Sequence, residues 1–267
     1  MLRIAPGNAP VEQVLHRSVE PVVTPMISCV MVTRGALYPA AHAIACFRAQ
    51  SHQPRELLIV TDAVDSPVSE HVDALRDPTI RLVMAPPAPL GVLRNHAIAH
   101  ARGEWLAQWD DDDLYHPDRL SIMAQAMLSD HGAVAVMLQR WTIWWPQRHI
   151  FALSGRRPWE GSMLVRRGAM PLYRAAHRGE DRPSIQAMMA LHPVLLMDRP
   201  ALYCYVVHGG NSYEAAHFEQ MLRWASAHGR PGDYAADWAH IARHMPLDDY
   251  ARSLDLPTPA EAERRQA

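Results

Sequence analysis

The four consecutive aspartates Asp110 to Asp113 are the feature of this sequence best suited to chemistry. They directly follow residues 104–109 (EWLAQW), an apolar run typical of a buried strand. Adjacent carboxylates repel one another, and a hard divalent cation, which prefers oxygen ligands, relieves that repulsion. Residues spaced i and i+2 at a strand end point the same way, so we expect Asp110 and Asp112 to face a metal. The alternative is that some of these aspartates are solvated or cap the next helix, and for Asp113 we favour a capping or supporting role.

Two further positions carry groups that could act with this cluster. Glu180 and Asp181 precede a helical segment, residues 184–191, and an aspartate within reach of a hydroxyl can take its proton. Two acids in a first helical turn also simply complement the helix dipole, which is the alternative. His208 ends an expected strand before two glycines, so its imidazole could complete a metal site. The chain has 16 histidines, and a structural role is the alternative for this one.

The elements that must position these groups follow an alternating pattern in the first half of the chain. Such alternation predicts a parallel, doubly wound sheet, in which ligands bind beyond the carboxyl ends of the strands. Asp62 and Asp110 fall at such ends. The expected strands are 26–33, 56–61, 80–84 and 104–109, and the expected helices are 39–50 and 92–101.

The second half of the chain predicts shorter strands and terminal helices. We expect helices at 117–129, 214–227 and 234–244, and strands at 133–138, 142–145, 149–153, 163–165, 194–197 and 201–207. No linker is long enough to divide the chain. We therefore expect one domain, 25–256, made of the parts 25–115, 116–212 and 213–256, between an N-terminal extension, 1–24, and a frayed tail, 257–267.

Composition excludes several classes of protein. A chain of 267 residues, 49% of them hydrophobic, can bury one sizeable core, and a net charge of -2 argues against a nucleic-acid partner. Three cysteines without a CxxC pair exclude a disulfide framework and indicate buried thiols in a reducing compartment. Without a signal-like apolar region or a run of roughly 20 apolar residues, we expect a cytoplasmic protein with at most peripheral contact at the inner membrane face.

Several segments, taken in order, resemble the family 2 glycosyltransferases, which adopt the GT-A fold. The resemblance is dense from residue 25 to about 120 and thinner to about 212. It implies an α/β GT-A-type fold: a doubly wound, mostly parallel sheet with helices on both faces and a smaller mixed region on the acceptor side. The segments are PMISCVMVT (25–33), CFRAQ (46–50), RELLIV (55–60), GVLRN (91–95), ARGEWLAQWDDDD (101–113) and HPDRL (116–120).

The resemblance implies an activity as well as a fold. Such enzymes are inverting, metal-dependent glycosyltransferases that move a sugar from a nucleotide diphosphate sugar, here with UDP-sugar favoured, to a hydroxyl of a glycan or lipid-linked acceptor. Bacterial surface polysaccharide synthesis is the expected setting. Mn²⁺ or Mg²⁺ would act as a Lewis acid on the departing diphosphate. Residues 25–115 would form the nucleotide-sugar-binding half and 116–212 the acceptor and catalytic half.

Site roles also follow from the resemblance. Asp181 would be the catalytic base, with Glu180 shaping the site, while Asp112 and His208 would hold the metal. Asp110 would contact the donor sugar or ribose. The remaining nucleotide-sugar-binding residues would be Thr33, Asp62, Arg94 and Asp111, and the acceptor-binding residues would be Trp159 and Glu160. For Arg94 the alternative is a helix N-cap contact or a surface salt bridge.

Two features of this region leave alternatives open. The family places two adjacent acids against the nucleotide base, and here Thr61 replaces the first, leaving Asp62 or Asp65 to select the base. Asp62 could instead form an Asx-type turn. The tryptophans at 141, 144, 145 and 159 could form a platform for a sugar acceptor, but we favour core positions for them, with Trp159 the best acceptor contact.

Other functions remain as alternatives. A non-catalytic sugar-nucleotide or glycan-binding module would not need Asp181. A nucleotidyltransferase is disfavoured because residues 33–36 (TRGA) are poor in glycine where it would bind phosphate. A phosphatase with an aspartyl nucleophile is disfavoured because the aspartates follow the fourth expected strand instead of the first. The donor sugar, the acceptor and the oligomeric state are left open by the sequence.

Overall fold

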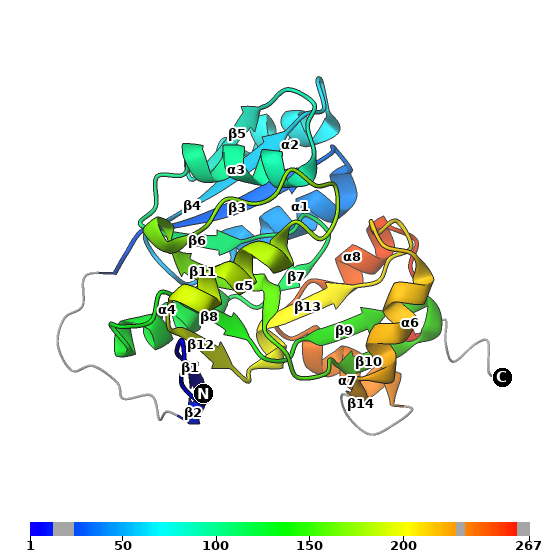
Figure 1. The fold of residues 1–267 in the computed structure, drawn as a ribbon. Helices are drawn as coiled ribbons and strands as arrows, with labels where there is room; N and C mark the ends of the chain where they lie inside the picture. The colour runs from blue at the N-terminus through cyan, green and yellow to red at the C-terminus, as the bar shows by residue number, and fades with distance from the viewer. Residues whose placement is uncertain (13–23, 228–232, 261–267) are drawn as a thin grey trace.

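The computed structural model describes residues 1–12, 24–227 and 233–260 (Figure 1). Within these residues the strands form two sheets. The larger sheet contains β1 (Leu2–Ile4), β2 (Val11–Glu12), β3 (Ile27–Thr33), β4 (Arg55–Thr61), β5 (Ile80–Met84), β6 (Trp105–Gln108), β8 (Ala135–Leu138), β11 (Trp159–Arg166) and β12 (Val194–Met197). Their order across the sheet is β2-β1-β12-β8-β11-β6-β3-β4-β5. All run in the same direction except β11 and β1, so the sheet is mostly parallel.

Helices cover both faces of this sheet because its strands are apolar on both sides. In β3, Cys29 and Met31 join a core with α1 (Leu37–Arg48), α2 (Pro67–Leu75) and α4 (Arg119–Ser129). Val30 faces the opposite side, in a second core with α3 (Leu90–His100) and α5 (Asp181–Leu191). Figure 1 shows α3 and α5 crossing the same face of the sheet. The expected α/β architecture with helices on both faces is therefore present.

The smaller sheet lies beside the carboxyl-terminal helices (Figure 1). Its strands are β7 (Leu114–Tyr115), β9 (Thr142–Trp145), β10 (Ile150–Leu153), β13 (Tyr203–Val206) and β14 (Ser226–Ala227), in the order β14-β10-β9-β13-β7. The helices are α6 (Ala215–Arg223), α7 (Tyr234–Ile241) and α8 (Leu247–Ser253), and short 3₁₀ turns occur at Pro146–Arg148, Arg167–Ala169 and Pro200–Leu202. Because β7 directly follows the four aspartates and pairs with β13, this sheet fixes one end of the aspartate segment.

The observed elements differ from the expected ones at several places. The sequence pattern missed α2, although Ser66 caps its amino end and Pro67 occupies its first turn. It also missed α8, β7, and β1, which pairs with β12 inside the region assigned to an N-terminal extension. Helix α5 begins at Asp181 instead of residue 184, and the helix expected over 214–227 ends at Arg223. Residues 261–267 of the expected frayed tail lie outside the described residues.

Two further expectations concern the thiols and the membrane. All three cysteines are buried and unpaired, as expected for small apolar side chains. Across residues 1–12, 24–227 and 233–260, no helix has the length and apolar character needed to cross a membrane.

Candidate active site

The acidic loop, defined as Asp110–Asp113, leaves the carboxyl end of β6 and holds its side chains in different environments. The side chain of Asp113 is fully buried, and its carboxylate accepts hydrogen bonds from the Val206 amide at 2.9 Å and from the Tyr203 hydroxyl. Asp118, not Asp113, stands at the N-cap position of α4. Asp113 therefore supports the loop from within the protein instead of capping the helix.

Asp112 points toward the carboxyl end of β13. Its Oδ2 atom lies 3.3 Å from Nε2 of His208 and 3.4 Å from Nδ2 of Asn211. The Asp112 side chain is 27% exposed, so it remains open to a ligand from solvent. The structure thus brings together the aspartate and the histidine that the sequence assigned to a metal.

Asp110 is joined to the rest of the site by Arg94. Its Oδ1 atom accepts from Nη2 of Arg94 at 3.1 Å and from Nε2 of Gln108 at 2.8 Å. Nε of the same guanidinium lies 3.0 Å from Oε1 of Glu180, which is a buried ion pair. Arg94 therefore bridges Asp110 of the acidic loop and Glu180, the N-cap residue of α5, so it does contact a helix N-cap, and its side chain is too buried for a surface salt bridge.

The Gly-x-x-Arg-Asn segment explains why Arg94 is held so firmly. A Cβ atom on residue 91 would lie 1.8 Å from the Arg174 carbonyl oxygen, so only glycine fits this close approach. Asn95 exchanges two hydrogen bonds with the backbone of Tyr173, at 2.8 and 2.9 Å. These contacts fasten the amino end of α3 to the segment that leads into Glu180.

Asp181 is the first residue of α5 and is half-buried. Its Oδ1 atom accepts a hydrogen bond from the Arg182 amide at 2.7 Å, in the manner of a first-turn acid. Burial raises the pKa of Asp110, and the charge of Arg94 opposes that rise. The charges of Asp112 and, to a smaller extent, Asp181 add to the rise. The start of α5 therefore carries Glu180, which pairs with Arg94, and Asp181, whose carboxylate accepts from the Arg182 amide.

Asp111 and Thr33 meet at the carboxyl ends of β6 and β3. Burial and the charge of Asp112 raise the pKa of Asp111 to about 7, while a hydrogen bond with the Thr33 hydroxyl opposes that rise. Asp62 is half-buried just beyond the end of β4. Thr61 is fully buried and its hydroxyl accepts from the Ala63 amide at 3.1 Å, so Thr61 shapes this turn.

The tryptophans divide between core and site. Trp141, Trp144 and Trp145 are buried, which agrees with the core interpretation. Trp159 is half-buried and stacks on Trp141 with ring centroids 4.2 Å apart. Within the same β11 strand, Glu160 forms an ion pair with Arg157 at 2.8 Å. A Cβ atom on Gly161, the next residue, would lie 3.2 Å from Oδ2 of Asp110, so this strand borders the acidic loop.

Sequence reasoning missed several residues that hold the acidic loop. The Tyr115 hydroxyl accepts from the Asp110 amide at 2.7 Å and donates to its carbonyl at 2.9 Å. Arg119 is fully buried, and its guanidinium carbon lies 4.8 Å from the Tyr115 ring centroid and 5.4 Å from that of Tyr203. Arg119 belongs to the segment HPDRL (116–120), but neither its residue type nor its place in the sequence shows that its cation is buried among aromatic rings.

The donor atoms present suit a divalent cation only in part. Among the described residues, no three His, Cys, Asp or Glu side chains converge closely enough to hold a metal ion alone. Asp112 Oδ2 and His208 Nε2 lie 3.3 Å apart. Adjacent ligands of an octahedral cation with bonds of about 2.1 Å lie roughly 3 Å apart, so this pair fits two adjacent positions. A small hard cation with few protein ligands normally fills its other positions with phosphate oxygens and water.

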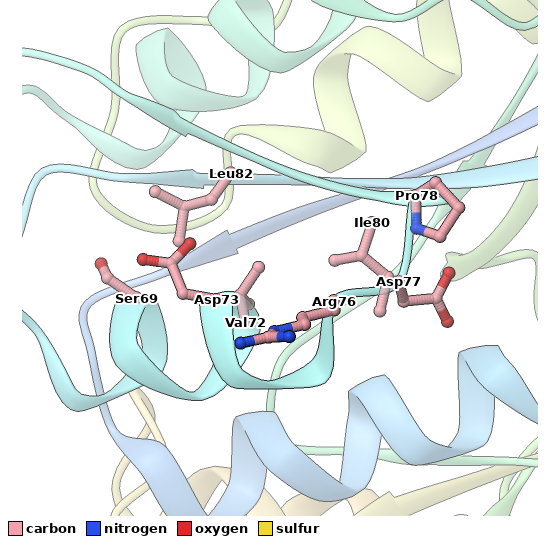
Figure 2. A pocket seen from close by; sticks show the side chains of 8 residues that line it. All are labelled: Ser69, Val72, Asp73, Arg76, Asp77, Pro78, Ile80 and Leu82. Atoms are coloured by element: carbon pink, nitrogen blue, oxygen red, sulfur yellow. The ribbon is translucent and has the colours of Figure 1, made fainter.

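A pocket of about 370 Å³ lies elsewhere, between α2 and the edge strand β5 (Figure 2). Its lining includes Val72, Asp73, Arg76 and Leu82, and none of the site residues expected from the sequence lines it. The candidate active site lies instead at the carboxyl ends of the central strands β3 and β6, around the acidic loop.

The fold is that of solved sugar-nucleotide-binding proteins. It resembles the mannosyltransferase PcManGT from Pyrobaculum calidifontis, solved in complex with GDP-Man and Mn²⁺, with a TM-score of 0.57 and 15% identity over 91% of this chain and 77% of that one. It also resembles S. aureus TarS 1–349, solved with UDP-GlcNAc, with a TM-score of 0.57 and 15% identity over 74% of this chain and 64% of that one. At this level of identity the likeness establishes the fold alone.

The sequence places the chain in a family. Residues 28–176 match Glycosyl transferase family 2, and the chain belongs to this family. Among its relatives are a putative colanic acid biosynthesis glycosyl transferase, WcaA, of Escherichia coli K12, 35% identical over 101 residues, and the succinoglycan biosynthesis protein ExoO of Rhizobium meliloti 1021, 30% identical over 113 residues. These matches cover 37% and 42% of this chain, and 36% and 32% of those two proteins. The resemblance drawn from the sequence motifs is confirmed.

Proposed function

We propose that this chain transfers a sugar, with inversion, from a nucleoside diphosphate donor to an acceptor hydroxyl, using a divalent cation at Asp112 and His208. The observation that carries the proposal is the bridge made by Arg94. One guanidinium contacts Asp110 of the acidic loop at 3.1 Å and lies 3.0 Å from Glu180, the neighbour of Asp181. The residues suited to hold the donor are thereby fixed next to a carboxylate suited to take a proton.

The donor would lie along the carboxyl ends of β3, β4 and β6. Asp110 would accept hydrogen bonds from the ribose or the donor sugar, with its carboxylate oriented by Arg94 and Gln108. Thr33, Asp62 and Asp111 would line the nucleotide side. Mn²⁺ or Mg²⁺, when bound, would supply Lewis-acid stabilisation for the charge that develops on the diphosphate. UDP-sugars remain our first choice, while the structural neighbours bind UDP-GlcNAc and GDP-Man.

Asp181 would receive the proton of the attacking hydroxyl. It is the half-buried first residue of α5, and its charge is felt at Asp110 of the acidic loop, which supports its role as the general base. Glu180 is held by Arg94 and keeps the helix start in place. Trp159, from β11, would offer an aromatic face to the acceptor sugar, with Glu160 beside it.

The acceptor class follows from the relatives alone. WcaA and ExoO carry names from colanic acid and succinoglycan biosynthesis, which supports a glycan or lipid-linked acceptor in bacterial polysaccharide synthesis. A lipid-linked acceptor would place the protein at the inner membrane face, as a peripheral protein.

A thermal-shift screen of UDP-, GDP- and dTDP-sugars, each with and without Mn²⁺, tests the donor and the metal together. We expect one nucleotide series to raise the melting temperature, and to raise it more with the metal present than without it. Donor turnover by the wild type, absent from Asp181→Asn, would separate an enzyme from a binding module. No stabilisation by any of these donors, with or without Mn²⁺, would contradict the proposal.

A further inference from the structure

The acidic loop receives a hydrogen bond from a helix far along the chain. Tyr250 of α8 donates from its hydroxyl to the backbone carbonyl oxygen of Asp112 at 2.6 Å. Residue 250 lies beyond residues 28–176, which match the family. The contact thus links the carboxyl-terminal helix to the residue expected to bind the cation.

Tyr250 is held rigidly where it makes this bond. Its side chain is fully buried, with ring centroids 5.2 Å from His42 and 5.8 Å from Trp144. A hydrogen bond of 2.9 Å between His42 and Ser253 fastens α8 to α1. The phenolic hydroxyl therefore has a fixed position relative to the sheet.

The peptide unit between Asp112 and Asp113 is fixed from both sides. Tyr250 holds its carbonyl oxygen, and the carboxylate of Asp113 is tied to the Val206 amide and the Tyr203 hydroxyl. Since the backbone at residue 112 sets the direction of its Cα–Cβ bond, these contacts direct the Asp112 carboxylate toward His208. The carboxylate itself is left partly exposed for a ligand.

We propose that Tyr250 is a positioning residue for the cation-binding carboxylate of Asp112, so that helix α8 sets the affinity of the site for its divalent cation. The inference rests on the proposed function, which makes Asp112 a cation ligand. Groups that orient a metal ligand typically change metal affinity by about 10- to 100-fold when they are removed. A single hydrogen bond to a backbone carbonyl belongs near the lower end of that range.

The test is Tyr250→Phe, which removes one hydroxyl and keeps the ring. Tyr234→Phe is the matched control, because the Tyr234 hydroxyl is also in the carboxyl-terminal region and bonds Trp144 at 3.0 Å and the Pro257 carbonyl at 3.4 Å. Free Mn²⁺ is followed by electron paramagnetic resonance as protein is added with UDP, and again with GDP. We expect Tyr250→Phe to weaken Mn²⁺ binding by about tenfold, and Tyr234→Phe to bind Mn²⁺ as the wild type does.

Nucleotide binding measured without metal distinguishes a loss of Asp112 positioning from a general loosening of the protein structure. With a chelator present, we expect UDP or GDP to bind Tyr250→Phe and the wild type equally. Mn²⁺ affinity of Tyr250→Phe equal to that of the wild type would overturn the proposal, and so would equal weakening in both tyrosine variants. A wild type that binds Mn²⁺ with neither nucleotide would instead refute the proposed cation site. If Tyr250→Phe does not fold, Ser253→Ala loosens α8 through its bond to His42, and unchanged Mn²⁺ affinity there overturns the proposal.

Discussion

At the two ends of the same parallel strands, the pKa values of carboxylates are shifted in opposite directions. At the amino ends, Glu56 of β4 accepts from the Ser28 hydroxyl at 2.5 Å, the Arg102 amide at 2.7 Å and the Arg81 guanidinium at 3.0 Å. Burial opposes ionisation there, but these donors outweigh it and lower the pKa of Glu56. The protein itself supplies the hydrogen-bond donors for this carboxylate, which therefore stabilises the fold.

At the carboxyl ends, the acidic loop gathers more negative charge than its partners compensate. Burial and the charge of a neighbouring aspartate raise the pKa of Asp111 to about 7, and the same causes raise the pKa of Asp113 well above its ordinary value. Arg94 is shared between Asp110 and Glu180. The comparison teaches that a buried acid matched by donors stabilises the structure, whereas an acid cluster with surplus charge is suited to bind a cation.

The largest effect is expected from Asp112→Asn, which removes the charge proposed to hold the cation. Sugar transfer should fall by roughly 10³-fold, because a charge-stabilising group is lost from the transition state. Stabilisation of the protein by donor plus Mn²⁺ in a thermal-shift assay should be lost as well. Asp118→Asn, whose side chain is 52% exposed and outside the loop, is the control. Full activity of the Asp112→Asn variant would contradict the cation-binding role proposed for the acidic loop.

The next effect is expected from Asp181→Asn. Transfer should fall by about 10²-fold because the acceptor hydroxyl loses the base proposed for it. Donor affinity, measured by calorimetry with Mn²⁺, should stay that of the wild type, since Asp181 is not proposed to touch the donor. Retained turnover would assign the base to another residue.

Glu56→Gln should affect stability and spare the site. Replacing the charged acceptor weakens its bonds with Ser28, Arg81 and the Arg102 amide, so the unfolding free energy should fall by about 2 kcal/mol. Urea denaturation measures the loss, and Mn²⁺-dependent donor binding is expected to be unchanged. A Glu56→Gln variant that is stable but binds no donor would contradict the purely structural role given to the carboxylate at the amino ends of the strands.

The smallest effect is a pair of opposite pH dependences in the metal-free protein. Because the pKa of Glu56 is lowered on folding, its stabilisation is present above its unfolded value of 4.5 and is lost as pH falls through the folded value. Because the pKa of Asp111 is raised from 3.8 to about 7, the folded chain holds an extra proton between those values, and stability falls as pH rises through this window. Urea denaturation from pH 4 to 8 should show Asp111→Asn flattening the second slope. An unchanged slope would show that Asp111 does not titrate in this range.

The local sequence pattern predicted much of the fold, but it predicted few of the contacts that hold the acidic loop. The apolar runs of β3, β4 and β6 predicted a parallel sheet, and the aspartates follow one of them, so the place of the acidic loop was predictable. The contact of Tyr250 with Asp112 joins residues 138 positions apart, and a single sequence has no signal for such a pair. Helix α8, with seven residues, is too short to give a clear apolar period.

The central claim is a divalent cation held by Asp112 and His208 beside a nucleoside diphosphate. The most direct test is anomalous diffraction at a wavelength that reports manganese, from crystals grown with Mn²⁺ and the donor selected by the thermal-shift screen. The account predicts one strong peak within about 2.1 Å of both Asp112 Oδ2 and His208 Nε2 and next to the diphosphate. A diphosphate bound without a peak at these two atoms would contradict it.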